Sequence, residues 1–119
     1  MKKILIIEDS LFSRKRLIKQ IQSAGFEVVE AGNGKDGFEQ LLLEKPDCVI
    51  CDLLMPIMDG FSFLEKCKTE NIKTPIIIIS ADIQETTKQK AKSLGAFSQL
   101  NKPANKKLLI DTISRAIQG

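Results

Sequence analysis

Residues 47–60 read DCVICDLLMPIMDG, an apolar run that ends at an acid and continues into a loop. The run from Asp47 to Cys51 is continuous rather than alternating, which is typical of a strand buried on both faces of a parallel sheet. It closes on Asp52, and the proline and glycine that follow indicate a loop. A helix is then expected over about 61–70. This strand–loop–helix order is the repeating unit of an α/β fold.

The same unit recurs on both sides of that stretch. Strands are also expected at 3–7, 26–31, 75–79 and 97–100. The half-polar 26–31 strand suits a sheet edge, and the β-branched 76–79 run suits the sheet interior. One helix ends at Gly25, and others are expected at about 35–45, 84–94 and 105–117. Helical spacing gives inward positions at Phe12, Leu17, Ile18 and Ile21 in the first helix and at Phe38, Leu41 and Leu42 in the second.

This alternation predicts five βα units in a single domain over residues 1–119. With short connections and right-handed crossovers, it becomes a doubly wound parallel sheet with helices on both faces. No linker, repeat or low-complexity segment interrupts the pattern.

Polar side chains close four of the five strands. Glu8 and Asp9 follow the first strand, Asp52 the third, Ser80 the fourth and Lys102 the fifth. Because the carboxyl ends of parallel strands lie along one edge of the sheet, where ligands bind, these groups are expected to converge in one crevice. Three acids against one lysine leave about two negative charges there, which favours occupation by a dication.

The residue types indicate a site for Mg²⁺ and a phosphoryl group. Mg²⁺ takes oxygen ligands and usually needs one or two carboxylates together with substrate oxygens. A carboxylate can also act as the nucleophile and form an acyl phosphate. A lysine and a hydroxyl can hold the remaining phosphoryl oxygens while the metal neutralises charge.

Composition excludes several other classes of protein. The 119 residues are 43% apolar and 28% charged, with a net charge of +3 and no histidine, so no phosphohistidine forms within this chain. No apolar run approaches the ~20 residues that span a bilayer. The apolar start is too short for a signal peptide, so a cytoplasmic protein is expected. The basic clusters lack interleaved aromatic residues, which argues against nucleic-acid binding.

Cys48 and Cys51 form a literal C-x-x-C motif, and Cys67 is a third cysteine. The motif falls in a predicted strand, where residues three apart point to opposite faces. Its two sulfurs then share neither a metal nor a disulfide. Core packing is the expected role of these cysteines.

Taken together, the motifs resemble the receiver domains of response regulators, of the CheY-like kind, over nearly the whole chain. The resemblance is carried by Glu8-Asp9-Ser10 with Arg14, Asp52 with Met55-Pro56 and Asp59-Gly60, Ser80-Ala81, and Lys102-Pro103. Each piece is common alone, and all four in this order are specific. The resemblance implies the strand order 2-1-3-4-5, for which CheY is itself a standard example.

The resemblance also implies a role for each residue of the crevice. Asp52 accepts a phosphoryl group, and Mg²⁺ is held by Asp9, Asp52 and the backbone carbonyl of Leu54, with Glu8 acting largely through water. The phosphoryl oxygens are contacted by Ser80 and Lys102. Ser10 and Asp59 are expected to cap helices.

The implied partners are proteins. The donor is the phosphohistidine of a sensor histidine kinase or of a phosphotransfer protein, and the chain assists its own phosphorylation without being an enzyme in the ordinary sense. A downstream target reads the surface of the fourth helix, the fifth strand and the fifth helix. Neither nucleic acid nor membrane is expected as a direct partner.

Three positions depart from the usual receiver pattern. Gln99 stands where the fifth strand usually carries the aromatic switch residue, Ala104 stands where a large apolar residue is common, and Ser80 replaces the commoner threonine. We expect Gln99 to stay outward and accessible, so that activation mainly orders residues 81–84. In the family, Leu54 and Asp82 would flank the path of the water that hydrolyses the acyl phosphate.

Two alternatives remain open at this point. Gly32, Gly34 and Gly37 form a G-x-G-x-x-G motif between a predicted strand and helix, which is the pattern of a dinucleotide site. A glycine-rich turn is the simpler reading. The second alternative is a receiver cut from a longer DNA-binding transcriptional regulator; the initial Met1 and the lack of a linker favour a stand-alone receiver.

Overall fold

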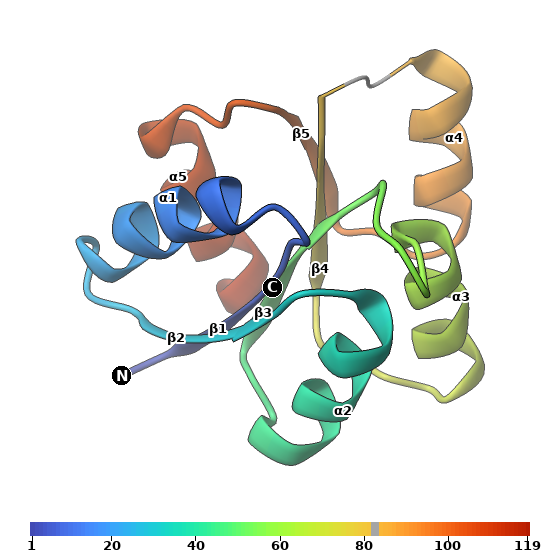
Figure 1. The fold of residues 1–119 in the computed structure, drawn as a ribbon, viewed down its shortest axis with the longest axis horizontal. Helices are drawn as coiled ribbons and strands as arrows, with labels where there is room; N and C mark the ends of the chain where they lie inside the picture. The colour runs from blue at the N-terminus through green and yellow to red at the C-terminus, as the bar shows by residue number, and fades with distance from the viewer. Residues whose placement is uncertain (82–83) are drawn as a thin grey trace.

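The computed structural model describes residues 1–81 and 84–119. Within them, five strands alternate with five helices (Figure 1): β1 (Lys3–Ile7), α1 (Leu11–Gln22), β2 (Glu27–Ala31), α2 (Gly34–Glu44), β3 (Cys48–Asp52), α3 (Gly60–Thr69), β4 (Ile76–Ser80), α4 (Glu85–Ser93), β5 (Ser98–Asn101) and α5 (Lys106–Gln118). The strands form one parallel sheet in the order β2-β1-β3-β4-β5. The predicted fold class and strand order are therefore confirmed.

The helices cover the sheet on both faces and make three layers. Figure 1 shows α1 and α5 on one side and α2, α3 and α4 on the other. The described strand residues of β1, β3 and β4 are almost entirely buried, as the continuous apolar runs predicted. At the edge, β2 has two exposed glutamates, two half-buried valines between them and a buried last residue, which agrees with its mixed composition.

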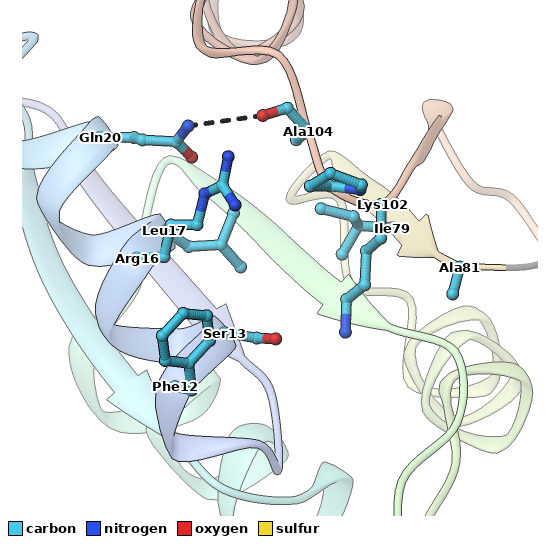
Figure 2. Close-up of a pocket in the computed structure, with 10 residues that line it drawn as sticks. Phe12, Ser13, Arg16, Leu17, Gln20, Ile79, Ala81, Lys102 and Ala104 are labelled. Atoms are coloured by element: carbon cyan, nitrogen blue, oxygen red, sulfur yellow. Dashed lines mark hydrogen bonds between the residues drawn. The ribbon is translucent and has the colours of Figure 1, made fainter.

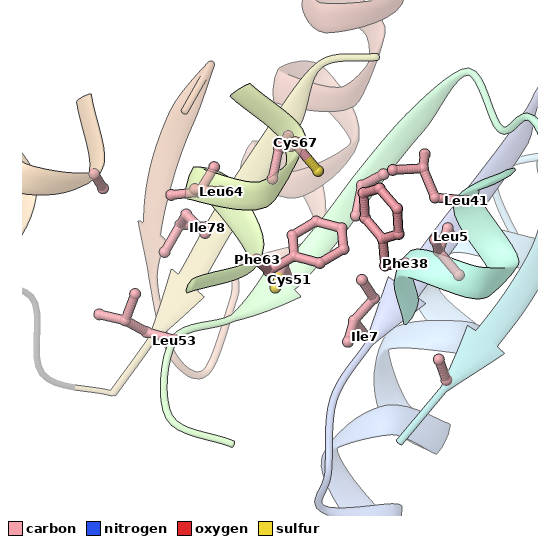
Figure 3. Packing of buried hydrophobic residues seen from close by; sticks show 14 residues of the cluster. Leu5, Ile7, Phe38, Leu41, Cys51, Leu53, Phe63, Leu64, Cys67 and Ile78 are labelled. Atoms are coloured by element: carbon pink, nitrogen blue, oxygen red, sulfur yellow. The ribbon is translucent and has the colours of Figure 1, made fainter. Parts of the chain in front are cut away.

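Two apolar clusters, one on each face, hold the layers together. Under α2 and α3, the rings of Phe38 and Phe63 meet edge to face with centroids 6.3 Å apart (Figure 3). On the other face, Leu109 and Ile113 of α5 and Ile21 of α1 are fully buried against the sheet. Each buried side chain of this size contributes about 1.5–3 kcal/mol to folding.

The C-x-x-C motif is structural, as predicted. Cys48 lies in the cluster under α1 and α5, whereas Cys51 lies in the cluster under α2 and α3. All three cysteines are free and buried. Burial raises the pKa of Cys48 and of Cys67 to about 12, so both stay protonated and unreactive at neutral pH.

Two residues expected to face inward do not. Phe12 is 80% exposed, because it lies on the opposite side of α1 from the buried Ile21. Leu42 is 55% exposed on α2, where Phe38 and Leu41 already fill the contact with the sheet. The angular position on the helix therefore accounts for Phe12, whereas Leu42 is displaced by its two neighbours on α2.

Two of the three glycines of the G-x-G-x-x-G motif, Gly34 and Gly37, have a packing function. A Cβ atom on Gly34 would lie 2.4 Å from the backbone oxygen of Met58, and one on Gly37 would lie 2.4 Å from Cδ1 of Ile7. The preceding strand, β2, is the edge of the sheet. Close approach of α2 to β1 and to the loop before α3 therefore explains Gly34 and Gly37 without a dinucleotide site.

Replacing Gly34 by alanine is expected to lower the free energy of unfolding by about 1–3 kcal/mol, because the backbone of Met58 would have to move to make room for the added Cβ. Gly32→Ala is the matched control: its added Cβ would meet only Nη1 of Arg14, at an ordinary 3.5 Å. Urea unfolding measures both. Equal stability of the two variants would contradict the packing explanation.

Candidate functional site

Three carboxylates converge at the carboxyl edge of the sheet. Glu8 and Asp9 follow β1 directly, and Asp52 is the last residue of β3. One carboxylate oxygen from each lies within 4.8 Å of the other two. Glu8 and Asp52 are buried, whereas Asp9 is exposed. The predicted acidic crevice is therefore present, and its three acids could hold a metal ion.

Lys102 reaches this cluster from the end of β5, the strand at the other edge of the sheet from β2. Its backbone N–H donates to the carbonyl oxygen of Ser80 (2.8 Å), which places the lysine just beyond β5. The ammonium donates to Oε1 of Glu8 and, at 3.0 Å, to Oδ2 of Asp52. Burial alone would lower the pKa of Lys102, but these two hydrogen bonds and the negative charges of the two acids together outweigh it, so the pKa is raised and the lysine stays charged.

The backbone orients the two buried acids. The second oxygen of Glu8 accepts the N–H of Ser10 at 3.0 Å, and Oδ1 of Asp52 accepts the N–H of Leu53 at 2.8 Å. Each carboxylate therefore has one oxygen held by the chain and the other directed at Lys102. Such an arrangement keeps the acids in place without consuming all of their acceptor capacity.

Ser80 ends β4 beside the acids and is buried. In the sheet it is paired with Asn101, immediately before Lys102. The structure thus brings Ser80 and Lys102, which are 22 positions apart in the sequence, to adjacent strand ends. This placement agrees with the sequence prediction.

The ion pair between Arg14 and Glu30, next to the backbone of Glu8, was not predicted. Arg14 donates from Nη1 to the carbonyl oxygen of Glu8 (2.6 Å) and from Nε to Oε1 of Glu30 (2.8 Å). The hydrogen bond from Arg14 lowers the pKa of Glu30. Sequence reasoning noted Arg14 as part of a motif, but its partner on β2 is distant in the sequence. The available signal for this ion pair was Glu30, a charged residue next to the buried end of the edge strand β2.

The comparisons with known proteins agree with this geometry. A family model for the response regulator receiver domain matches residues 4–114. The chain belongs to the response regulator receiver family. It is therefore a receiver of two-component signalling, the class to which the sequence motifs pointed.

Several relatives of similar length resemble this receiver in sequence and structure. It is 35% identical to the protein PilH of Pseudomonas aeruginosa over the full length of both, and 34% identical to the chemotaxis protein CheY of Treponema pallidum over 98% of this chain and 83% of that protein. The structure of the chemotaxis protein CheY4 of Vibrio cholerae superposes with a TM-score of 0.91 at 31% identity, covering 98% of each chain.

The loop of this receiver between β3 and α3 is tightly folded. The Gly60 N–H donates to the carbonyl oxygen of Leu53 (2.8 Å), and a Cβ on Gly60 would lie 2.7 Å from the carbonyl oxygen of Asp52. Asp59 caps α3 by accepting the N–H of Ser62. Leu54 is 71% exposed at the start of this loop. The predicted cap at Asp59 is confirmed.

Ser10 caps α1 by accepting the N–H of Ser13, again as predicted. Asp82, which was expected to lie near the path of hydrolytic water, falls outside the described residues, as does part of the 81–84 segment. Among residues 1–81 and 84–119, no helix combines the length and apolar character that crossing a bilayer requires.

Gln99 is half-buried, so its expected outward and accessible position is met only in part. Nε2 donates to the backbone carbonyl oxygen of Lys88 on α4 at 2.8 Å, and Oε1 is buried. The expectation rested on the cost of burying an amide without partners. The nitrogen avoids that cost by bonding to the helix, which sequence alone did not reveal.

Proposed function

We propose that Asp52 accepts a phosphoryl group from the phosphohistidine of a sensor histidine kinase or of a phosphotransfer protein. A carboxylate oxygen of Asp52 forms the new bond to phosphorus, the phosphorus–nitrogen bond breaks, and its electron pair leaves with the imidazole. The supporting observation is the buried carboxylate of Asp52 beside Glu8, with Lys102 as its cationic hydrogen-bond partner. Residues 1–119 would form one receiver domain, acting through partners and not as an enzyme.

The donor set fits Mg²⁺. Glu8, Asp9 and Asp52 offer only oxygen ligands, which this cation prefers. The backbone carbonyl of Leu54 would add a fourth oxygen, as the resemblance to receivers implies. Three carboxylates against one ammonium leave the crevice with a net negative charge. When bound, Mg²⁺ would neutralise charge between the acids and the phosphoryl oxygens.

Lys102 and Ser80 would bind the phosphoryl oxygens. The ammonium of Lys102 already reaches Asp52 Oδ2, so it lies where charge develops on the transferred group. Ser80 presents its hydroxyl at the adjacent strand end. Glu8, fully buried and bonded to the same ammonium, would hold Lys102 in position.

The first turns of α1 offer a surface for the phosphodonor protein. Leu11 and Phe12 are exposed there, and Figure 2 shows Phe12 and Arg16 facing Lys102 and Ala104 across a groove of about 290 Å³. The small Ala104 leaves room in this groove. We propose that the kinase or phosphotransfer protein binds on this side, and that downstream proteins bind the surface of α4, β5 and α5.

Intact mass spectrometry tests the proposal. With Mg²⁺ and a small acyl-phosphate donor, the wild type is expected to gain one phosphoryl group and Asp52→Asn none. Asp59→Asn is the matched control, because Asp59 lies in the same loop and caps α3; it should be labelled like the wild type. Labelling of Asp52→Asn to the wild-type extent would refute the assignment.

The lifetime of the phosphoryl group gives a further prediction. Leu54 is apolar and exposed beside Asp52, so it cannot orient a hydrolytic water. Leu54→Asn is expected to accelerate dephosphorylation by about tenfold, which is less than the roughly 100- to 10,000-fold that a full general acid–base contact contributes. Direct decay of the labelled mass measures the rate, with Leu54→Met as control. An unchanged rate in Leu54→Asn would argue against this role.

A further inference from the structure

The groove beside Lys102 is continuous with the crevice that contains Asp52. Lys102 lines the groove, and its ammonium also donates to Oδ2 of Asp52 at 3.0 Å. Figure 2 shows Phe12 and Arg16 of α1 on the opposite side of the groove from Lys102. A small molecule whose phosphoryl group reaches Asp52 therefore has the mouth of this groove next to its remaining atoms.

Apolar side chains form most of the lining of the groove. Leu17, Ile79 and Ala104 are buried along it, whereas Phe12 and Pro103 are exposed at its edge. Its volume is about 290 Å³, close to the lower end of the roughly 300–1,000 Å³ that is typical of small-molecule sites. The groove therefore has room for one small apolar group.

The small side chain of Ala104 keeps this space open. Receivers commonly carry a large apolar residue at this position, and such a side chain would take up part of the groove that Ala104 lines. The carbonyl oxygen of Ala104 accepts a hydrogen bond from Nε2 of Gln20 on α1 at 3.4 Å, which joins the two walls of the groove. The opening is thus a property of this chain and not of the fold in general.

Arg16 places an unpaired cation at the groove. Its neighbours Arg14 and Lys15 both pair with Glu30. Arg16 has no hydrogen bond or ion pair with any residue among 1–81 and 84–119. A guanidinium binds a carboxylate through two parallel N–H bonds. Together with the apolar lining, it favours a ligand that joins a carboxylate to an apolar body.

We propose that this groove is a leaving-group site for small acyl phosphates with an apolar acyl group, such as an aromatic one. The proposal rests on the proposed function, because the phosphoryl group is transferred to Asp52. A carboxylate oxygen of Asp52 forms the bond to phosphorus. The bond from phosphorus to the bridging oxygen of the donor breaks, and its electron pair leaves with that oxygen as the free carboxylate.

Each part of the groove has a role in this transfer. The apolar acyl group lies between α1 and Ala104, out of water. The guanidinium of Arg16 binds the carboxylate as negative charge develops on it. Lys102, which both sites share, contacts the phosphoryl oxygens. The chain thereby has a route to the phosphoryl state that needs no protein donor.

Rates of labelling by benzoyl phosphate, acetyl phosphate and phosphoramidate, measured by intact mass spectrometry with Mg²⁺, test the site. Phosphoramidate has no acyl group, so its rate in the same protein corrects for folding and for the chemistry at Asp52. In Ala104→Phe, the ratio of the benzoyl phosphate rate to the phosphoramidate rate is expected to fall at least about tenfold, because one methylene in an apolar pocket already changes such a ratio by about 10–200-fold. The ratio for acetyl phosphate should fall less, and Ala24→Phe, at an exposed position, is the control.

Arg16→Gln tests the charge at the groove. The ratio of either acyl phosphate rate to the phosphoramidate rate is expected to fall about two- to fivefold, the effect of one exposed ion pair. Lys19→Gln removes the same charge from an exposed position of α1 that does not line the groove, so its ratios should match the wild type.

The outcomes separate this site from the proposed function. Wild-type ratios in both Ala104→Phe and Arg16→Gln would overturn the leaving-group site and leave Asp52 as the acceptor. If even phosphoramidate failed to label Ala104→Phe, wild-type ratios in the exposed Arg16→Gln would overturn the site alone. A wild type that none of the three donors labels would refute the proposed function and the leaving-group site together.

Discussion

Replacing Lys102 by methionine is expected to lower the free energy of unfolding by about 2–3 kcal/mol at neutral pH. The substitution leaves Glu8 and Asp52, both buried, facing each other without a cation. Removing one partner of a buried ion pair costs about 3–5 kcal/mol. The expected loss is smaller than that range because the Lys102 side chain is 20% exposed, so water screens part of the interaction. Urea unfolding without metal gives the value, and Lys107→Met, at an exposed position of α5, is the control.

Mg²⁺ should recover part of that loss. A dication supplies the positive charge that the variant lacks, so Mg²⁺ is expected to raise the Tm of Lys102→Met more than that of the wild type. A loss no greater than that of Lys107→Met, or an equal Mg²⁺ effect on both proteins, would contradict the pairing seen in the crevice.

The difference in the free energy of unfolding between wild type and Lys102→Met should depend on pH in a defined direction. The pKa of Lys102 is raised in the folded protein, since its hydrogen bonds to Glu8 and Asp52 outweigh the opposing effect of burial. The stability that Lys102 contributes is therefore complete below the pKa of a free lysine, about 10.4, and is lost as pH rises through the higher pKa of the folded state. The stability gap between wild type and Lys102→Met should be constant from neutral pH to about pH 10 and close above it. A gap that closed near neutral pH would contradict this assignment.

Asp9→Asn is expected to weaken Mg²⁺ binding by at least about tenfold with little effect on stability. Two unit charges 4 Å apart interact by about 1 kcal/mol even in bulk water, and a dication doubles this. Asp9 is exposed, so its replacement removes no buried contact. Calorimetric titration with Mg²⁺ measures the affinity, and Asp111→Asn on α5 is the control. If Asp9→Asn and Asp111→Asn bound Mg²⁺ equally well, Asp9 would not be a ligand.

Much of the site followed from the sequence because parallel strands end at a common edge. Glu8, Asp52 and Ser80 each close an apolar run, so their convergence needed only the correct fold class. The caps at Ser10 and Asp59 could also be predicted from the sequence, since capping depends on residues three positions apart.

The features that sequence missed depend on contacts between distant elements. Arg14 and Glu30 pair across α1 and β2, and Gln99 finds its acceptor on a backbone carbonyl, which has no signature in the side-chain sequence. Phe12 was misplaced for a different reason: its apolar character suggested burial, whereas its angular position on α1 directs it to solvent. Leu11, its neighbour, is exposed as well, so this part of α1 belongs to the surface and not to the core.

The most direct test of the account is to identify the phosphorylated residue itself. Borohydride reduction of an aspartyl phosphate yields homoserine, so protein labelled with an acyl-phosphate donor in Mg²⁺ can be reduced, digested and sequenced by tandem mass spectrometry. The account predicts homoserine at position 52, and only there, with Asp9 and Asp59 unmodified. Homoserine at another aspartate, with Asp52 intact, would contradict it.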